Sequence, residues 1–186
     1  MSTTRKRFII FLIALTSLPF FLLLFEVDYS YFSIDLEFFY FDLAKTFGSI
    51  FGLVGAIFMM WQFVLGTRYI AKKISPDVLW LNKIHKNLGI YGTLFVFVHP
   101  FIQMYVQAEN LAFVLLPGSL ETDFDRHVAF GRMALFMIIF IWVTSAILRK
   151  KIAFRPWKYI HYIAYVALFF VFLHSLEFGS VVKNKE

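Results

Sequence analysis

The sequence predicts an all-α integral membrane protein, a helical bundle with five transmembrane spans. Of the 186 residues, 60% are hydrophobic and 21% are aromatic, whereas soluble domains are about half apolar. Apolar runs long enough to cross about 30 Å of hydrocarbon recur along the chain. They cover about residues 8–25, 43–66, 86–107, 128–148 and 159–178. We therefore interpret residues 1–186 as a single membrane domain.

The first two runs each have an alternative interpretation. The first follows Arg5, Lys6 and Arg7, but no small-x-small cleavage site follows it, which favours an uncleaved anchor over a signal peptide. The second carries glycines at small-xxx-small spacing, a pattern typical of close helix packing. No strand precedes them, so a dinucleotide-binding loop is not expected. These glycines are Gly48, Gly52 and Gly55.

The other runs are separated by breaks and by segments of opposite charge. Pro76 and Pro156 interrupt the two basic connections, and Pro117-Gly118 marks a turn in an acidic one. The N-terminus and the basic connections together hold 13 of the 18 Lys and Arg residues. By the positive-inside rule they face the cytoplasm. The aromatic segment 26–42 then lies outside, and the third and fifth spans both run outward. This topology explains the net charge of +6, so we do not expect nucleic-acid binding.

Four of the five histidines form two pairs in the third and fifth runs. His85 and His99 are 14 residues apart, and His161 and His174 are 13 apart. At 1.5 Å per residue each pair spans roughly 20 Å, so each run offers one imidazole near each leaflet. Ionisable residues at membrane depth are rare and usually functional. We interpret the four as axial ligands of two stacked hemes, with His85 and His161 on the inner heme and His99 and His174 on the outer one.

The composition restricts how such hemes are held. The chain has no cysteine, which excludes disulfides, cysteine-ligated clusters and the covalent attachment of c-type heme. The expected cofactors are therefore two b hemes, which axial ligation and packing hold in place.

The third run places its histidines on one stripe with small residues between them. On an ideal helix Gly89, Gly92 and Val96 lie within about 40° of His85. The two glycines predict a recess for a flat macrocycle, although small residues also allow two helices to approach closely. In the fifth run 13 residues turn the ideal helix by about 220°. A tilt or a locally tightened turn is then needed for His161 and His174 to serve one side.

Heme propionates need cationic or hydrogen-bonding partners, and several residues near the two levels are candidates. The inner candidates are Arg68, Lys86, Arg155 and Lys158, and the outer ones are Lys45, Arg132 and His127. Lys45 and Arg132 stand in otherwise apolar outer-leaflet segments, where snorkelling side chains are an equal alternative. For His127 a solvated interfacial role has similar weight.

Four stretches carry a resemblance to a known family. They are GLVGAIFMMWQFVLGTRYIAKKI (52–74), LNKIHKNLGIYGTLFVFVHP (81–100), AFGRMALFMIIFIWVTSAILRK (129–150) and RPWKYIHYIAYVALFFVFLHS (155–175). Together with the two histidine pairs they resemble the ferric reductase-like transmembrane domain shared by ferric reductases and NADPH oxidases.

The resemblance implies a six-helix oxidoreductase with two b hemes on its third and fifth helices. A cytoplasmic dehydrogenase domain that binds a flavin (FAD or FMN) and NAD(P)H follows the sixth helix in that family. This chain has five spans and lacks that domain, so we expect the donor to be a fused segment of a longer protein or a separate flavoprotein. In the oxidases, basic and polar residues near the outer heme help to form an oxygen site, for which Lys45 and Gln103 are the candidates here.

Three functions remain open on the sequence. The first is electron transfer across a bacterial plasma membrane to oxygen, giving superoxide, or to ferric chelates. The second is a heme-bearing membrane subunit that serves a separate periplasmic reductase, as in the bacterial methionine sulfoxide reductase system. The third is a non-redox metal transporter, which would usually place carboxylates or broken helices near midplane. The fifth run has only Glu177, at its edge, so this third function is the least favoured.

Overall fold

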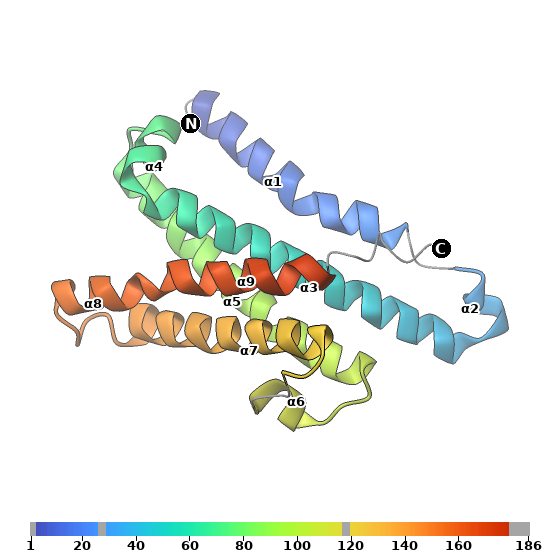
Figure 1. Cartoon of the computed structure of the whole chain (residues 1–186). Coiled ribbons are helices and arrows are strands. Elements are labelled where there is room, and N and C mark those ends of the chain that lie inside the picture. Colours follow the sequence, from blue (N-terminus) through green and yellow to red (C-terminus); the bar gives the residue numbers. More distant parts are fainter. Residues whose placement is uncertain (1–2, 26–28, 117–119, 179–186) are drawn as a thin grey trace. The chain divides into compact units, whose positions relative to one another are not determined.

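A computed structural model describes residues 3–25, 29–116 and 120–178, and these residues form helices joined by short connections (Figure 1). Within this part of the chain there is no β-strand. In chain order the helices are α1 (Thr3–Leu24), α2 (Tyr31–Ile34), α3 (Leu36–Gly66), α4 (Arg68–Ile74), α5 (Val78–Val106), α6 (Leu111–Leu115), α7 (Asp123–Trp142), the π-helix η1 (Val143–Ile147), α8 (Phe154–His161) and α9 (Ile163–Phe178).

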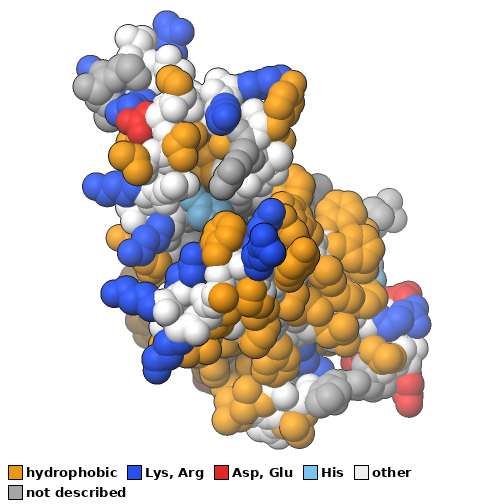
Figure 2. Space-filling model, turned by 90° about the vertical axis from the view of Figure 1, so that its left-hand side faces the viewer, with side chains coloured by type: hydrophobic (Ala, Val, Ile, Leu, Met, Phe, Trp, Pro, Cys, Tyr) orange, Lys and Arg blue, Asp and Glu red, His pale blue; other side chains and the backbone are white. Residues whose placement is uncertain are grey.

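Five helical segments are long and apolar enough to cross a membrane, which confirms the five predicted spans. They are Thr3–Leu24, Leu36–Gly66, Val78–Val106, Asp123–Ile147 and Phe154–Leu176. Large hydrophobic side chains remain exposed on them, among them Ile10 at 66% and Phe169 at 57%. Figure 2 shows hydrophobic side chains over much of one face of the molecule. Such surfaces suit contact with lipid, so the chain is an integral, multi-pass membrane protein.

The helices begin before the apolar runs that they contain, and N-caps explain the two largest extensions. The α3 helix begins at Leu36 rather than near residue 43, because the Asp35 side chain accepts a hydrogen bond from the Phe38 N–H. The α5 helix begins at Val78 rather than near residue 86, with Asp77 as its cap. Residues 31–34 and 36–42 are therefore helical, and His85 lies well inside α5.

The chain divides into two compact units, residues 1–110 and 111–186, each of which has its own packing. In the first unit α3 packs along α5, with Ile50 and Val54 fully buried between its helices. A Cβ atom at Gly55 would lie 2.7 Å from the Val96 Cγ2 atom. The predicted role of the α3 glycines in close helix packing is thus confirmed at this position.

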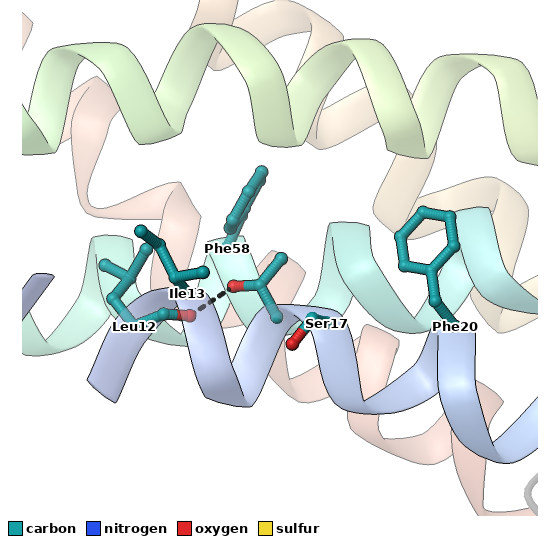
Figure 3. A pocket seen from close by; sticks show the side chains of 6 residues that line it. Leu12, Ile13, Ser17, Phe20 and Phe58 are labelled. Carbon is teal, nitrogen blue, oxygen red and sulfur yellow. Dashed lines mark hydrogen bonds between the residues drawn. The ribbon is translucent and has the colours of Figure 1, made fainter. Parts of the chain in front are cut away.

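An open apolar pocket of about 260 Å³ lies between α1 and α3 in the first unit (Figure 3). Its hydroxyl groups turn back to their own helix, since Thr16 Oγ1 donates to the Leu12 carbonyl at 2.7 Å and Ser17 Oγ to the Ala14 carbonyl at 3.0 Å. The lining residues are Leu12, Ile13, Thr16, Ser17, Phe20 and Phe58. None of the four paired histidines lines this pocket.

An ion pair between one arginine and one aspartate joins the start of α1 to the start of α5. Asp77 Oδ1 accepts a hydrogen bond of 3.0 Å from the Trp80 N–H, and its Oδ2 forms an ion pair with Arg5. The Arg5 guanidinium also lies over the Trp80 ring, 5.3 Å from its centroid. The Trp80 N–H first, and the Arg5 charge next, hold the pKa of the Asp77 carboxyl below its usual 3.8.

We expect Asp77→Ala to lower the Tm of the protein in detergent more than Asp77→Asn does, because asparagine still caps a helix but carries no charge. A depressed folded-state pKa means that ionised Asp77 stabilises the fold above the unfolded pKa. That contribution is lost as the pH falls through the folded pKa. The Tm difference between wild type and Asp77→Asn should therefore shrink between about pH 7 and about pH 3. A pH-independent difference would contradict this assignment.

In the second unit α7 packs along α9, and each has one irregular segment. The α7 helix starts with a capping box, in which Thr122 and Asp125 cap each other's backbone, and it ends in the π-helix η1. Opposite, α8 and α9 are separated by a turn at Tyr162. There the Tyr162 N–H donates to the carbonyls of Lys158 and Tyr159, and the Tyr165 N–H to that of Tyr162 at 3.0 Å. The tightened turn considered from the sequence is therefore present, directly after His161.

Candidate functional site

His99 on α5 is held against the backbone of α3 in the first unit. Its Nδ1 atom lies 2.8 Å from the Gly48 carbonyl oxygen. The imidazole covers Gly52, where a Cβ atom would come within 2.9 Å of His99 Cε1. Real Cβ atoms do not approach other heavy atoms so closely, so this ring position needs glycine at residue 52.

His174 on α9 has a closely similar setting in the second unit. Its Nδ1 atom lies 2.7 Å from the His127 carbonyl oxygen on α7. A Cβ atom at Gly131 would lie 2.7 Å from His174 Nδ1 and 2.8 Å from its Cε1. Each of these two histidines is thus held by one carbonyl, with its ring on a glycine one turn further along the neighbouring helix.

These contacts define the chemistry of both imidazoles. A carbonyl oxygen can only accept a hydrogen bond, so Nδ1 must carry the hydrogen in His99 and in His174. In the neutral ring the lone pair is then on Nε2, the atom that ligates a metal. Histidines that ligate metals almost always donate their other N–H to a carbonyl or carboxylate in this way. Both residues therefore have the hydrogen-bond partner expected of a ligand.

His85 also faces α3, but its surroundings are looser. A Cβ atom at Gly66 would lie 3.8 Å from His85 Cε1, an ordinary van der Waals distance. The side-chain amide of Gln62 donates a hydrogen bond of 2.5 Å to the His85 backbone carbonyl. Both histidines of α5 therefore point to one neighbouring helix, as the stripe from His85 to His99 predicts.

His161 at the end of α8 lies between a serine and a tryptophan. Its Nδ1 atom is 3.3 Å from Ser145 Oγ of η1, and its ring stacks on Trp157 with centroids 5.0 Å apart and planes at 22°. His174 contacts α7, and His161 contacts the π-helix that continues α7. Both histidines therefore face the same neighbouring helix. The uniform helical wheel, which separated them by about 220°, was wrong here because the turn at Tyr162 tightens the helix.

The recess predicted at Gly89 and Gly92 is filled by side chains of α3. A Cβ atom at Gly89 would lie 3.2 Å from Gln62 Oε1, and one at Gly92 would lie 2.9 Å from Phe58 Cβ. The structure therefore favours the alternative, in which small residues let the two helices approach. The prediction that a macrocycle lies on these glycines was wrong, since α3 takes up that side of α5.

The outer-pocket candidates differ in their settings. Gln103 lies close to Gly48, the residue whose carbonyl binds His99, because a Cβ atom at Gly48 would lie 2.8 Å from Gln103 Nε2. Lys45 is exposed. Arg132 donates from Nε to the Phe113 carbonyl of α6 and lies over the Phe113 ring, 5.0 Å from its centroid. His127 serves His174 through its carbonyl, while its own ring packs edge-on against Phe130.

The candidate partners of the inner propionates make few contacts with other described residues. Lys86, Arg155 and Lys158 are exposed, and the Lys158 ammonium lies 5.5 Å from the centroid of the Tyr162 ring. The Arg68 side chain lies outside the described part of the structure. These residues stay predictions as propionate partners.

Sequence reasoning missed several residues that contact the histidines. Gly131, Ser145 and Gln62 come from neighbouring helices, so no spacing within one helix points to them. Trp157 was detectable, because it stands four residues before His161 and shares its helix face. Arg149 was also missed; it contacts Trp157 rather than a histidine, with its guanidinium carbon 4.5 Å from the centroid of the Trp157 ring. Among the described residues no three His, Asp or Glu side chains gather into a metal site; a b heme with two axial histidines does not require such a group.

Together these features define a multi-pass helical membrane module whose paired histidines face neighbouring helices. Residues 51–172 match the family model described as ferric reductase like transmembrane component. This match covers more than half of the chain, so the protein belongs to the ferric reductase-like transmembrane family, a class of oxidoreductase membrane modules linked to transmembrane electron transfer. Neither the curated proteins nor the solved structures gave a significant match.

Proposed function

We propose that this protein carries electrons across a bacterial plasma membrane through two b hemes, with His85 and His161 as axial ligands of the inner one and His99 and His174 of the outer one. The observation that carries the proposal is the matched setting of His99 and His174. Each donates Nδ1–H to a carbonyl and rests on a glycine, so each presents Nε2 as a ligand. The hemes, when bound, supply one-electron carriers at two depths of the membrane.

The chain's own residues perform three tasks in this proposal. The carbonyls of Gly48 and His127 fix the tautomer and the plane of the outer ligands. Ser145 and Trp157 hold His161, and the Gln62 amide binds the backbone at His85. Apolar helices exclude water around these groups, which together with the ligands sets reduction potentials. Two histidines would leave each iron no open position, so an acceptor would have to take its electron without binding to the metal.

The direction of transfer follows from charge. The basic N-terminus and basic connections support a cytoplasmic position for the inner ligands, by the positive-inside rule. Because the interior is negative, outward movement of an electron is favourable by roughly 2.3 kcal/mol per 100 mV of membrane potential. A cytoplasmic flavoprotein that oxidises NAD(P)H is then the donor, and oxygen or a ferric chelate outside is the acceptor.

A vesicle experiment tests this function. The purified, heme-loaded protein is reconstituted into liposomes that enclose ferricyanide, and dithionite is added outside. We expect the enclosed ferricyanide to be reduced several times faster than in protein-free liposomes. The double variant His85→Ala/His99→Ala, which removes a ligand at each level, should return the rate to that of empty liposomes.

Two results would overturn the proposal. One is a rate for the wild-type protein equal to that of empty liposomes. The other is an unchanged rate in the double variant, since electrons would then cross by another route. A metal transporter would give the first result and would show no heme absorbance.

A further inference from the structure

Two aromatic rings and one guanidinium group are in contact in the second unit. The Arg149 guanidinium carbon lies 4.5 Å from the centroid of the Trp157 ring, and the His161 imidazole stacks on Trp157 with ring centroids 5.0 Å apart. The planes of Trp157 and His161 differ by only 22°. These groups come from the segment after η1 and from α8.

Two further contacts hold the Arg149 side chain beside Trp157. Arg149 donates from Nη1 to the Ile152 carbonyl at 3.4 Å, and its guanidinium also lies 5.6 Å from the Phe154 ring centroid. The Trp157 indole N–H is buried and has no hydrogen-bond partner among the described residues. Trp157 therefore makes its described contacts with the guanidinium and the imidazole through the faces of its ring.

The charge at Arg149 is not balanced nearby along the chain. No Asp or Glu occurs between Arg126 and Leu176. Among the described residues no carboxylate forms an ion pair with Arg149. A positive charge stabilises a redox group that has gained an electron, and screening is weak where water is excluded. Trp157, whose indole nitrogen is buried, contacts both the guanidinium and the imidazole.

We propose that the Arg149–Trp157–His161 stack raises the reduction potential of the inner electron carrier, with Trp157 as the positioning residue that holds the His161 plane and Arg149 as the source of the charge. This inference rests on the proposed function, in which His161 ligates the inner heme. It assigns a role to Arg149 and Trp157 that ligation by His161 does not itself require.

Potentiometric titration of the heme-loaded protein in detergent tests the inference. In Arg149→Gln we expect the inner carrier to become harder to reduce by about threefold to tenfold in its equilibrium constant. This corresponds to a shift of about 28 to 59 mV for one electron. The outer carrier should keep its potential. The wave that His161→Ala abolishes identifies the inner carrier.

Matched variants separate charge and stacking from general damage. Lys150→Gln removes the same charge from the adjacent, exposed position and should leave both potentials unchanged. Arg149→Lys keeps the charge and should retain most of the potential. Trp157→Phe keeps a stacked ring, whereas Trp157→Leu does not, so only the latter should change the low-spin electron paramagnetic resonance signal that reports the orientation of the imidazole planes.

The outcomes distinguish this inference from the proposed function. If the wild-type protein binds no heme, the proposed function fails and the inference with it. If two hemes bind and Arg149→Gln leaves both potentials unchanged, or Lys150→Gln shifts them equally, only the inference is overturned. Should Trp157→Leu fail to fold, the comparison of Arg149→Gln with Lys150→Gln decides.

Discussion

Replacing His99 or His174 by alanine should remove one of the two b hemes and leave the other. Each of these residues is proposed to supply one axial ligand to the outer heme, and a b heme has no covalent bond to replace it. Heme per chain, measured as the pyridine hemochrome of purified protein, should fall by about half relative to wild type. Electron transfer into ferricyanide-loaded vesicles should fall to the background rate, because the outer step is missing.

The inner variants His85→Ala and His161→Ala provide the matched comparison. They should lose the same amount of heme, but the remaining heme should show a different potential from that in His99→Ala. Retention of two hemes in any of the four single variants would contradict the ligand assignment. His127→Ala should keep both hemes, because His127 serves His174 through its backbone carbonyl.

Placing a side chain at Gly131 or Gly52 should disturb the outer ligands almost as strongly. A Cβ atom would meet the ring of His174 at 2.7 Å or that of His99 at 2.9 Å, so the imidazole must move away from its carbonyl. Loss of the hydrogen-bond partner of a ligating histidine typically weakens metal binding by about 10- to 100-fold. We therefore expect Gly131→Ala and Gly52→Ala to lower outer-heme occupancy by at least about tenfold in affinity.

Gly66→Ala is the control for this prediction. A Cβ atom at Gly66 would lie 3.8 Å from His85 Cε1, so the ring can stay where it is. Heme titration into the apo-protein, followed by the Soret absorbance, measures all three variants under one condition. Equal heme affinity in Gly66→Ala and Gly131→Ala would show that these close contacts do not position the ligands.

The sequence predicts much of the architecture because its signals are local. Apolar runs gave all five spans, and the helical wheel placed His85 and His99 on one face of α5, although it did not indicate that α3 packs on this face. The apolar runs do not show where each helix starts, because a single capping residue decides this, as Asp35 and Asp77 do. The wheel for the fifth span failed because it assumes uniform winding, whereas the turn at Tyr162 tightens the helix after His161.

The residues around the histidines were less accessible to sequence reasoning. Gly52 and Gly131 matter only because a ring from another helix rests on them, and nothing in their own helices indicates this. Gly89 and Gly92 were interpreted as a recess for a macrocycle for the same reason. Gln62 and Phe58 of α3 occupy the space beside them, which α5 alone does not indicate. Trp157 is the exception, since its spacing of four residues from His161 lies within one helix.

The most direct test of the ligand assignment is the heme content and spectrum of the purified wild-type protein. Dithionite reduction should give the sharp α-band of low-spin b heme, with two hemes per chain by pyridine hemochrome. Electron paramagnetic resonance of the oxidised protein should show only low-spin iron with two imidazole ligands. A heme-free protein, or a high-spin signal from an iron with one histidine, would contradict the account.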